Sequence, residues 1–200
     1  MSAPIIYLAS ASPRRHDILQ QMNVLHRVLR VPAAPGADEP RLENETPECY
    51  VRRTARDKAT RATEWIIAQS LSQWPVLSAD TTVILDRDIL GKPADHDDAT
   101  RMLGRLSGRT HSVHTAIALA HQGRLLEDVS VTAVRMKKLS AVEIDAYCKT
   151  VEPLGKAGGY GIQGYAARFI EHISGSYTGV MGLPIFETHR LLLAAGLLQS

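Results

Sequence analysis

The sequence has few cysteines and no long uncharged stretch, and these two absences exclude several classes of protein. Its only cysteines, Cys49 and Cys148, lie far apart and show no CxxC spacing, so neither a disulfide framework nor a zinc knuckle is indicated. No uncharged segment is long enough to span a bilayer, and residues 1–10 lack the basic start of a signal peptide. We therefore expect a cytoplasmic protein with no membrane association.

An excess of charge of either sign is also absent. The 23 basic and 21 acidic residues leave a formal net charge of +2, and aromatic residues make up 5% of the chain. A protein that binds nucleic acid would be expected to carry a basic stripe with aromatic side chains on a sheet. We therefore expect no nucleic-acid partner, and any anion-binding site must be built from local groups.

The sequence contains enough apolar residues to form one hydrophobic core. Hydrophobic residues make up 44% of the 200 residues, which predicts a single domain over residues 1–200, folded either as one body or as two lobes around a cleft. Hydrophobic periodicity and capping residues predict both strands and helices. The predicted strands are 5–9, 75–78, 82–85, 113–117, 129–134 and 168–173, and the predicted helices begin at Pro13, Pro47, His96 and Ala141, with a further helix that closes the chain.

The start of the first predicted helix is an unusual place for cations. Ser12 is its expected N-cap and Pro13 its first residue, so Arg14 and Arg15 lie in the first turn. There the helix dipole disfavours each cation by roughly 0.3–1 kcal/mol. An anion bound by the N–H groups of this turn would reverse the sign and form a phosphate or nucleotide site. The alternative is that two solvated arginines merely tolerate the position, and this motif alone does not separate the two.

Three carboxylates and two lysines are further candidates, each with an ordinary alternative. Asp80 is expected where a strand gives way to a loop, a common position for a catalytic carboxylate but also for a strand-end cap. Asp38 and Glu39 lie in a predicted surface loop, where acidic pairs are usually only solvated. Lys58 and Lys92 would be ordinary surface lysines unless the loops converge, in which case they would bind phosphates.

A cluster of glycines gives the strongest loop signal in the chain. The segment from Gly155 to Gly164 holds five glycines in ten residues, too many for the interior of a helix or a strand. It predicts a loop whose backbone is kept free to approach another group closely. Gln163 lies within this loop.

Taken together, the segments that carry these candidates resemble the Maf family in order and spacing, from about residue 5 to 195. The resemblance implies an α/β fold of ITPase-like type, with an elongated mixed sheet flanked by helices and two lobes around a nucleotide cleft. It also implies a homodimer that hydrolyses a nucleoside triphosphate between the α and β phosphates, with Mg²⁺ or Mn²⁺ as cofactor. The segments are Ser10–Arg15, Asp38–Glu39, Tyr50–Ala59, Ser78–Thr81, Gly91–Pro93, Lys156–Gly164, Gly175–Tyr177 and Gly182–Pro184.

The same resemblance implies roles for individual residues. Asp80 resembles the general base that takes a proton from the attacking water, and Glu39 resembles a metal-binding or water-orienting carboxylate. The implied metal ligands are therefore Glu39 and Asp80, and Lys58 joins them as a catalytic residue. The groups that would neutralise the triphosphate and the pyrophosphate leaving group are Ser10, Arg14, Lys58 and Lys92.

The family branch that acts on dTTP and UTP carries an Arg, a Thr and a Gln at the positions that match Arg14, Thr81 and Gln163. A Gln carboxamide offers a donor and an acceptor side by side, which matches O4 and N3–H of uracil and thymine and mismatches the amino group of cytosine. The resemblance therefore implies dTTP and UTP as substrates. One departure is Gly155, where many relatives have Asp, so that a further metal contact is missing.

Two other functions are compatible with parts of the sequence. A nucleotide-binding regulator of septum formation would use the same helix start and glycine loop without hydrolysis, but it would gain nothing from the carboxylates Asp80 and Glu39 facing a polyanion. An enzyme that removes noncanonical purine nucleotides would differ in the base it recognises. The choice among dTTP, UTP and modified pyrimidine nucleotides stays open, because one methyl group changes discrimination by only about 1–3 kcal/mol.

Overall fold

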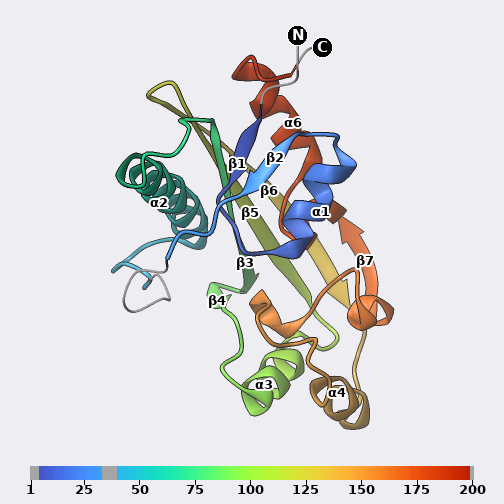
Figure 1. Cartoon of the computed structure of the whole chain (residues 1–200). Coiled ribbons are helices and arrows are strands. Elements are labelled where there is room, and N and C mark those ends of the chain that lie inside the picture. The colour runs from blue at the N-terminus through green and yellow to red at the C-terminus, as the bar shows by residue number, and fades with distance from the viewer. Residues whose placement is uncertain (1–4, 33–39, 199–200) are drawn as a thin grey trace. The chain divides into compact units, whose positions relative to one another are not determined.

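The computed structural model describes residues 5–32 and 40–198, and Figure 1 shows its strands and helices along the chain. Among these residues, seven strands form one mixed sheet in the order β2-β1-β3-β5-β6-β7, and β4 pairs with β3. The predicted α/β class, with a mixed sheet flanked by helices, is confirmed. The strands are β1 (Ile6–Leu8), β2 (His26–Val28), β3 (Val76–Leu85), β4 (Asp88–Leu90), β5 (Thr110–His121), β6 (Arg124–Met136) and β7 (Ile170–Ser174). The helices are α1 (Pro13–Gln21), α2 (Pro47–Ala68), α3 (His96–Leu106), α4 (Ala141–Cys148), α5 (Tyr177–Met181) and α6 (Ile185–Ala194), with the 3-10 helices η1 (Ala157–Gly159) and η2 (Tyr165–Phe169).

The chain divides into two compact units. The first unit comprises Met1–Asp80, Thr115–Val129 and Gly182–Ser200, and the second comprises Thr81–His114 and Ser130–Met181. In neither unit does a described helix combine the length and the apolar content that crossing a bilayer requires. The expectation of one domain over residues 1–200 is not tested by this division and stays a prediction.

In the first unit, α2 packs on the sheet through small side chains. Its buried residues Ala55 and Ala59 form one cluster with Ala116 and Ala118 of β5. Small residues on both sides allow the helix backbone to lie close to the sheet, because no long side chain separates them. The hydroxyl of buried Ser78 on β3 donates a hydrogen bond across this contact to the carbonyl of Ala55, at 2.7 Å.

The predicted starts of the first four helices are confirmed. Pro13 is the first residue of α1, and Ser12 precedes it in extended conformation. Ser12 differs from the other caps, because its side chain makes no capping hydrogen bond. At the other three helices the N-cap side chain accepts from a backbone N–H in the first turn, which satisfies a donor that has no partner within the helix. These bonds are Cys49 to Thr46 (3.2 Å), Asp98 to Asp95 (2.7 Å) and Glu143 to Ser140 (3.3 Å).

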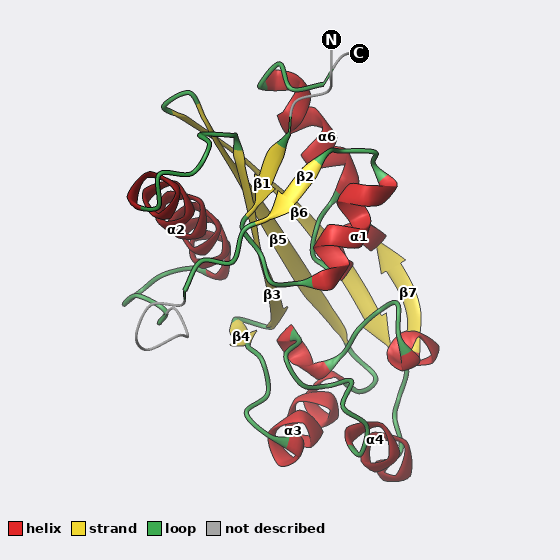
Figure 2. Cartoon of the chain, viewed as in Figure 1, coloured by secondary structure: helices red, strands yellow, loops and turns green. Residues whose placement is uncertain are grey.

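In the second unit, the core forms around aromatic side chains and the helices α3 and α4, which lie side by side (Figure 2). Tyr147 of α4 and Phe169 of η2 are fully buried and contact each other edge to face. Nε2 of His111 lies 2.7 Å from the hydroxyl of Tyr160 in the glycine loop. Burial lowers the pKa of His111 to about 4 and raises the pKa of Tyr160, so both groups are neutral near pH 7.

The hairpin and the glycine loop are also confirmed. β5 and β6 are joined by the two-residue turn Gln122–Gly123, and no α-helix or strand forms among the described residues from Gly155 to Gly164. Other predictions of local structure are wrong. Residues 75–78 and 82–85 are not separate strands, because β3 runs through Asp80 without a break. Residues 168–173 divide between η2 and β7, and the short strands β2 and β4 are not predicted.

Candidate active site

The segment after β1 brings a serine and an arginine together in the first unit. The hydroxyl of Ser10 accepts hydrogen bonds from Nη1 of Arg15 (3.1 Å) and from the backbone N–H of Ser12 (3.2 Å). Nε of Arg15 donates to the carbonyl of Gly182 at 2.8 Å, which ties α1 to the segment before α6. Contacts at two nitrogens therefore fix the guanidinium. Arg14 is the site residue expected from the sequence, whereas the structure shows these contacts for Arg15.

The pKa of Arg15 reflects its burial and two charged neighbours, Asp80 and Arg14. Burial lowers the pKa of Arg15 to about 10, while the negative charge of Asp80 acts to raise it and the positive charge of Arg14 acts to lower it. Burial also lowers the pKa of Arg14. Arg15 still carries its charge near pH 7, since that is well below its pKa. Two guanidinium groups and one carboxylate thus influence each other here, in a chain whose formal net charge is only +2.

Lys58 of α2 and Asp80 of β3 form an ion pair in which the ammonium donates to Oδ1 of the carboxylate. The Asp80 side chain is 15% exposed and that of Lys58 is 29% exposed, so water reaches both groups only in part. Partial burial strengthens the attraction between the charges and makes the loss of either partner costly. The structure therefore pairs Lys58 with Asp80 in the first unit, and it places Arg15, which Ser10 contacts, within electrostatic reach of Asp80.

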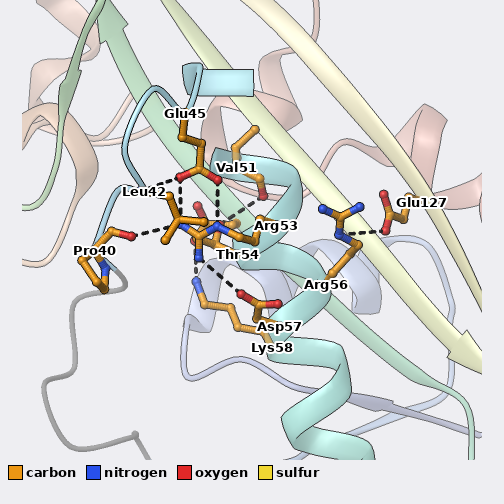
Figure 3. A network of polar contacts seen from close by, with 11 residues as sticks. Pro40, Leu42, Glu45, Val51, Arg53, Thr54, Arg56, Asp57, Lys58 and Glu127 are labelled. Carbon is orange, nitrogen blue, oxygen red and sulfur yellow. Dashed lines mark hydrogen bonds and ion pairs between the residues drawn. The ribbon is translucent and has the colours of Figure 1, made fainter. Parts of the chain in front are cut away.

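A second polar network anchors the segment that precedes α2, as Figure 3 shows. Nε and Nη2 of Arg53 donate to the two carboxylate oxygens of Glu45, at 2.7 and 2.9 Å, and Nη2 also donates to the carbonyl of Pro40 at 3.0 Å. The Glu45 carboxylate accepts a further bond from the backbone N–H of Leu42 at 3.1 Å. The hydrogen bonds from Arg53 hold the pKa of Glu45 below its usual value.

Arg53 is a residue whose contacts sequence reasoning did not predict. It lies in the segment Tyr50–Ala59 that supports the family resemblance, but its partners, Glu45 and the carbonyl of Pro40, are a side chain and a backbone atom of irregular structure. A signal was present in the spacing, because Glu45 precedes the helix cap and Arg53 lies two turns into the helix. The network holds the described residues from Pro40 to Glu45 against α2.

Two further predicted site residues lie in the second unit. Lys92 follows β4 and Gln163 lies in the glycine loop, and both side chains are exposed. The backbone N–H of Gly158 donates to the carbonyl of Gly91 at 2.9 Å, so the loops that carry Lys92 and Gln163 touch. Gly158 has φ +68°, and a Cβ there would lie 3.0 Å from the methyl groups of Val83, so glycine is required for this approach.

The remaining predictions are the site residue Thr81 and the expected metal ligands. Thr81 directly follows Asp80 on β3 and is half-buried. Glu39, like Asp38, lies outside the described residues. Within residues 5–32 and 40–198, no three His, Cys, Asp or Glu side chains gather as they would around a metal ion. A metal ion held by Asp80 would therefore lack two further ligands of these types from the described residues.

Comparison with known proteins identifies the family of this chain. The model of the family described as "Maf-like protein" matches residues 5–195, which include every site residue discussed above. The chain belongs to the Maf family. The resemblance seen in the separate sequence segments is thereby confirmed across nearly the whole chain.

Several relatives are similar to this Maf protein over nearly their whole length. A protein of Bordetella pertussis is 61% identical over 194 residues, which cover 97% of this chain and 94% of the relative. A protein of Polaromonas sp. is 48% identical over 200 residues, with 98% of each chain covered. A protein of Cupriavidus metallidurans is 47% identical over 197 residues, with 96% of this chain and 98% of the relative covered. All three relatives are named dTTP/UTP pyrophosphatase.

The Arg53 network predicts a stability difference between neighbouring arginines. Arg53→Lys keeps the positive charge but cannot serve Glu45 and Pro40 together, so the free energy of unfolding should fall by about 1–3 kcal/mol. Arg52→Lys is the matched control, because Arg52 makes one exposed pair with Glu48 and its loss should change stability by less than about 0.5 kcal/mol. Urea denaturation of both variants measures the difference. Equal effects would show that the network does not anchor this segment.

Proposed function

We propose that this Maf protein is a nucleoside triphosphate pyrophosphatase that hydrolyses dTTP and UTP to the monophosphate and pyrophosphate. The observation that carries the proposal is the Asp80 carboxylate, held against Lys58 and near Arg15, in a chain whose relatives at 47–61% identity are named for this activity. Fixed cations beside a carboxylate suit hydrolysis of a polyanionic substrate, because one group activates water while the others bind phosphate.

The proposed reaction uses Asp80 as the general base. Asp80 takes a proton from a water molecule whose oxygen attacks the α-phosphorus, and the bond from that phosphorus to the bridging oxygen of the β-phosphate breaks. Pyrophosphate then leaves, and the nucleoside monophosphate remains. Lys58 orients the carboxylate through its hydrogen bond and adds positive charge next to the reacting phosphate.

The phosphate groups would be bound by residues of the helices α1 and α2 and of two loops. Arg15 is held by Ser10 and by the carbonyl of Gly182, so its guanidinium presents a fixed positive charge. A preorganised cation stabilises developing charge better than one that must first reorient. We include Arg15 with the predicted phosphate-binding residues Ser10, Arg14, Lys58 and Lys92.

The chemistry of Asp80 also suits a divalent cation. Mg²⁺ is usually held by one or two carboxylates together with substrate phosphates and water, rather than by a cage of protein ligands. Asp80 can supply such a carboxylate, and we propose Asp80 and Glu39 as the residues that hold Mg²⁺ or Mn²⁺. The ion would neutralise charge on the triphosphate.

We further propose that Gln163 recognises the pyrimidine base, with Arg14 and Thr81 supporting the same selectivity. Gln163 is exposed on a loop that is fixed against the Lys92 loop, so its carboxamide is available to a ligand. The pairing of a donor and an acceptor would favour uracil and thymine. Modified pyrimidines that keep O4 and N3–H belong to the same proposed class. The homodimer is proposed on the family resemblance alone, and the cytoplasmic location is proposed on the two widely separated cysteines.

Replacement of Asp80 tests the general base. Asp80→Asn should leave a folded protein that still binds UTP but turns over at least about 100-fold more slowly, since an amide cannot accept the proton. Asp86→Asn is the control, because Asp86 lies just beyond β3 in an exposed pair with Arg109. Pyrophosphate release and UTP binding are measured on both variants. Turnover near that of the wild type in Asp80→Asn would exclude Asp80 as the base.

Removal of metal tests the proposed cofactor. Hydrolysis of UTP should vanish in excess EDTA and return when Mg²⁺ or Mn²⁺ is added, because a carboxylate facing a triphosphate needs a cation between them. The measurement is pyrophosphate release before and after restoring each ion. A protein that keeps its full rate in EDTA would contradict the metal proposal while leaving Asp80 testable by its own variant.

Base choice tests the substrate class. The wild type should cleave UTP and dTTP with higher kcat/KM than CTP or GTP, because cytosine reverses the donor and acceptor at the positions that Gln163 would contact. Gln163→Glu removes the amide donor at nearly constant size, so it should lower kcat/KM for UTP and dTTP more than for CTP and GTP. Equal efficiency for CTP and UTP in the wild type would argue against base recognition by Gln163 and in favour of another nucleotide class.

A further inference from the structure

Gln163 lies in a short turn whose backbone is fixed at both ends. The N–H of Gly164 donates to the carbonyl of Gly161 at 3.0 Å, which closes the turn. Ile162 is buried, with 5% of its surface exposed, whereas the neighbouring Gln163 is exposed. The side chain of Ile162 therefore packs into the core of the second unit, and the side chain of Gln163 points outward. What holds the two ends determines where the carboxamide of Gln163 lies.

The end after the turn is held by Glu152, which precedes the glycine loop. Its Oε2 accepts from the backbone N–H of Tyr165 at 2.8 Å, and its Oε1 accepts from the N–H of Ala166 at 3.3 Å. These are the first N–H groups of η2, whose N-cap residue Gly164 has no side chain to cap them. Glu152 thus acts as the cap from a distant place in the sequence, and both of its oxygens are used.

The end before the turn is held by Tyr147 of α4, which is fully buried. Its hydroxyl donates to Oε1 of Glu152 at 3.1 Å and faces the backbone N–H of Gly161. Burial and the adjacent carboxylate raise the pKa of Tyr147, so the phenol keeps the proton that it donates. Polar contacts therefore link Gly161, through Tyr147 and Glu152, to the N–H groups that follow Gly164.

Gly164 shows how closely the carboxylate lies against the turn. A Cβ at this position would lie 2.5–2.6 Å from the carboxylate atoms of Glu152, far inside van der Waals contact. The backbone of Gly164 has φ −104°, which any residue can adopt, so glycine is needed here for space and not for conformation. The turn and the carboxylate thus fit each other directly, with no side chain between them.

We propose that Glu152, acting with Tyr147, is a positioning residue that holds Gln163 in place and thereby sets the choice of base. This inference rests on the proposed function of Gln163 in recognising the pyrimidine. A carboxamide that pairs with two adjacent base atoms must be held to within about 0.5 Å, because a small displacement breaks both hydrogen bonds. Glu152 supplies that restraint through backbone atoms on one side of the turn and, through Tyr147, on the other.

Two variants test the role of Glu152 at nearly constant shape. Glu152→Gln leaves one acceptor oxygen where two are used, and Tyr147→Phe removes the hydroxyl that links Glu152 to Gly161. In both, the ratio of kcat/KM for UTP to that for CTP should fall about tenfold or more, on the scale of a misplaced contact. KM for UTP should rise while kcat stays within about threefold, because the proposed phosphate-directed groups Lys58 and Asp80 are unchanged. Glu171→Gln is the matched control, an exposed glutamate on β7 that pairs with Arg135 and should change neither quantity.

Two readouts separate positioning from a purely structural role. Hydrogen exchange in the peptide from Gly158 to Ala166 should be faster in Glu152→Gln than in Glu171→Gln, because the turn loses its anchor. The double variant Glu152→Gln, Gln163→Glu should show the same UTP to CTP ratio as Gln163→Glu alone, since Glu152 acts through Gln163. If Glu152→Gln does not fold, Tyr147→Phe carries the same expectations.

The outcomes also separate this inference from the proposed function. A ratio that falls in Gln163→Glu but not in Glu152→Gln and Tyr147→Phe overturns the positioning role and leaves base recognition by Gln163 standing. An equal loss of kcat/KM for UTP and CTP in the Glu152 and Tyr147 variants also overturns it, because that pattern indicates general destabilisation. A wild type that does not prefer UTP over CTP overturns both.

Discussion

The packing of small side chains between α2 and the sheet is the constraint on which the charged groups of the first unit depend. Ser78 and Asp80 lie two residues apart on β3 and therefore project from the same face. Both contact α2, Ser78 at the carbonyl of Ala55 and Asp80 at Lys58, one turn further along the helix. Successive contacts along β3 therefore match successive turns of α2. This match is possible only because alanine lets the two backbones approach.

Local signals made much of the fold predictable. The starts of α1 to α4 depend on a cap and the residues of one turn, which are contiguous in the chain, so Ser12, Thr46, Asp95 and Ser140 could be assigned from the sequence. The prediction of a strand break at Asp80 is wrong, because the structure there depends on residues that are distant in the chain. Four polar residues from Ser78 to Thr82 interrupt an apolar run, but pairing with other strands keeps β3 extended, and no local pattern reports that pairing.

The candidate site was predictable only in its residue types. Ser10, Lys58 and Asp80 are residue types that suit phosphate chemistry, and the structure shows Lys58 paired with Asp80 and Ser10 bonded to Arg15. Arg15, Arg53 and Glu152 are different, because many of their partners are backbone atoms such as the carbonyls of Gly182 and Pro40 and the N–H of Tyr165. Every residue carries such atoms, so sequence alone does not indicate which of them a side chain will contact.

The partial burial of Arg15 has a consequence for how this protein can vary. Its guanidinium is partly shielded from water in the folded chain, so a phosphate that binds later has less of that water to remove. Folding alone would favour an apolar side chain in such surroundings, because buried charge is costly. Thermal robustness and affinity for anions therefore place opposite demands on this one position, and a sequence selected only for robustness would drift away from arginine here.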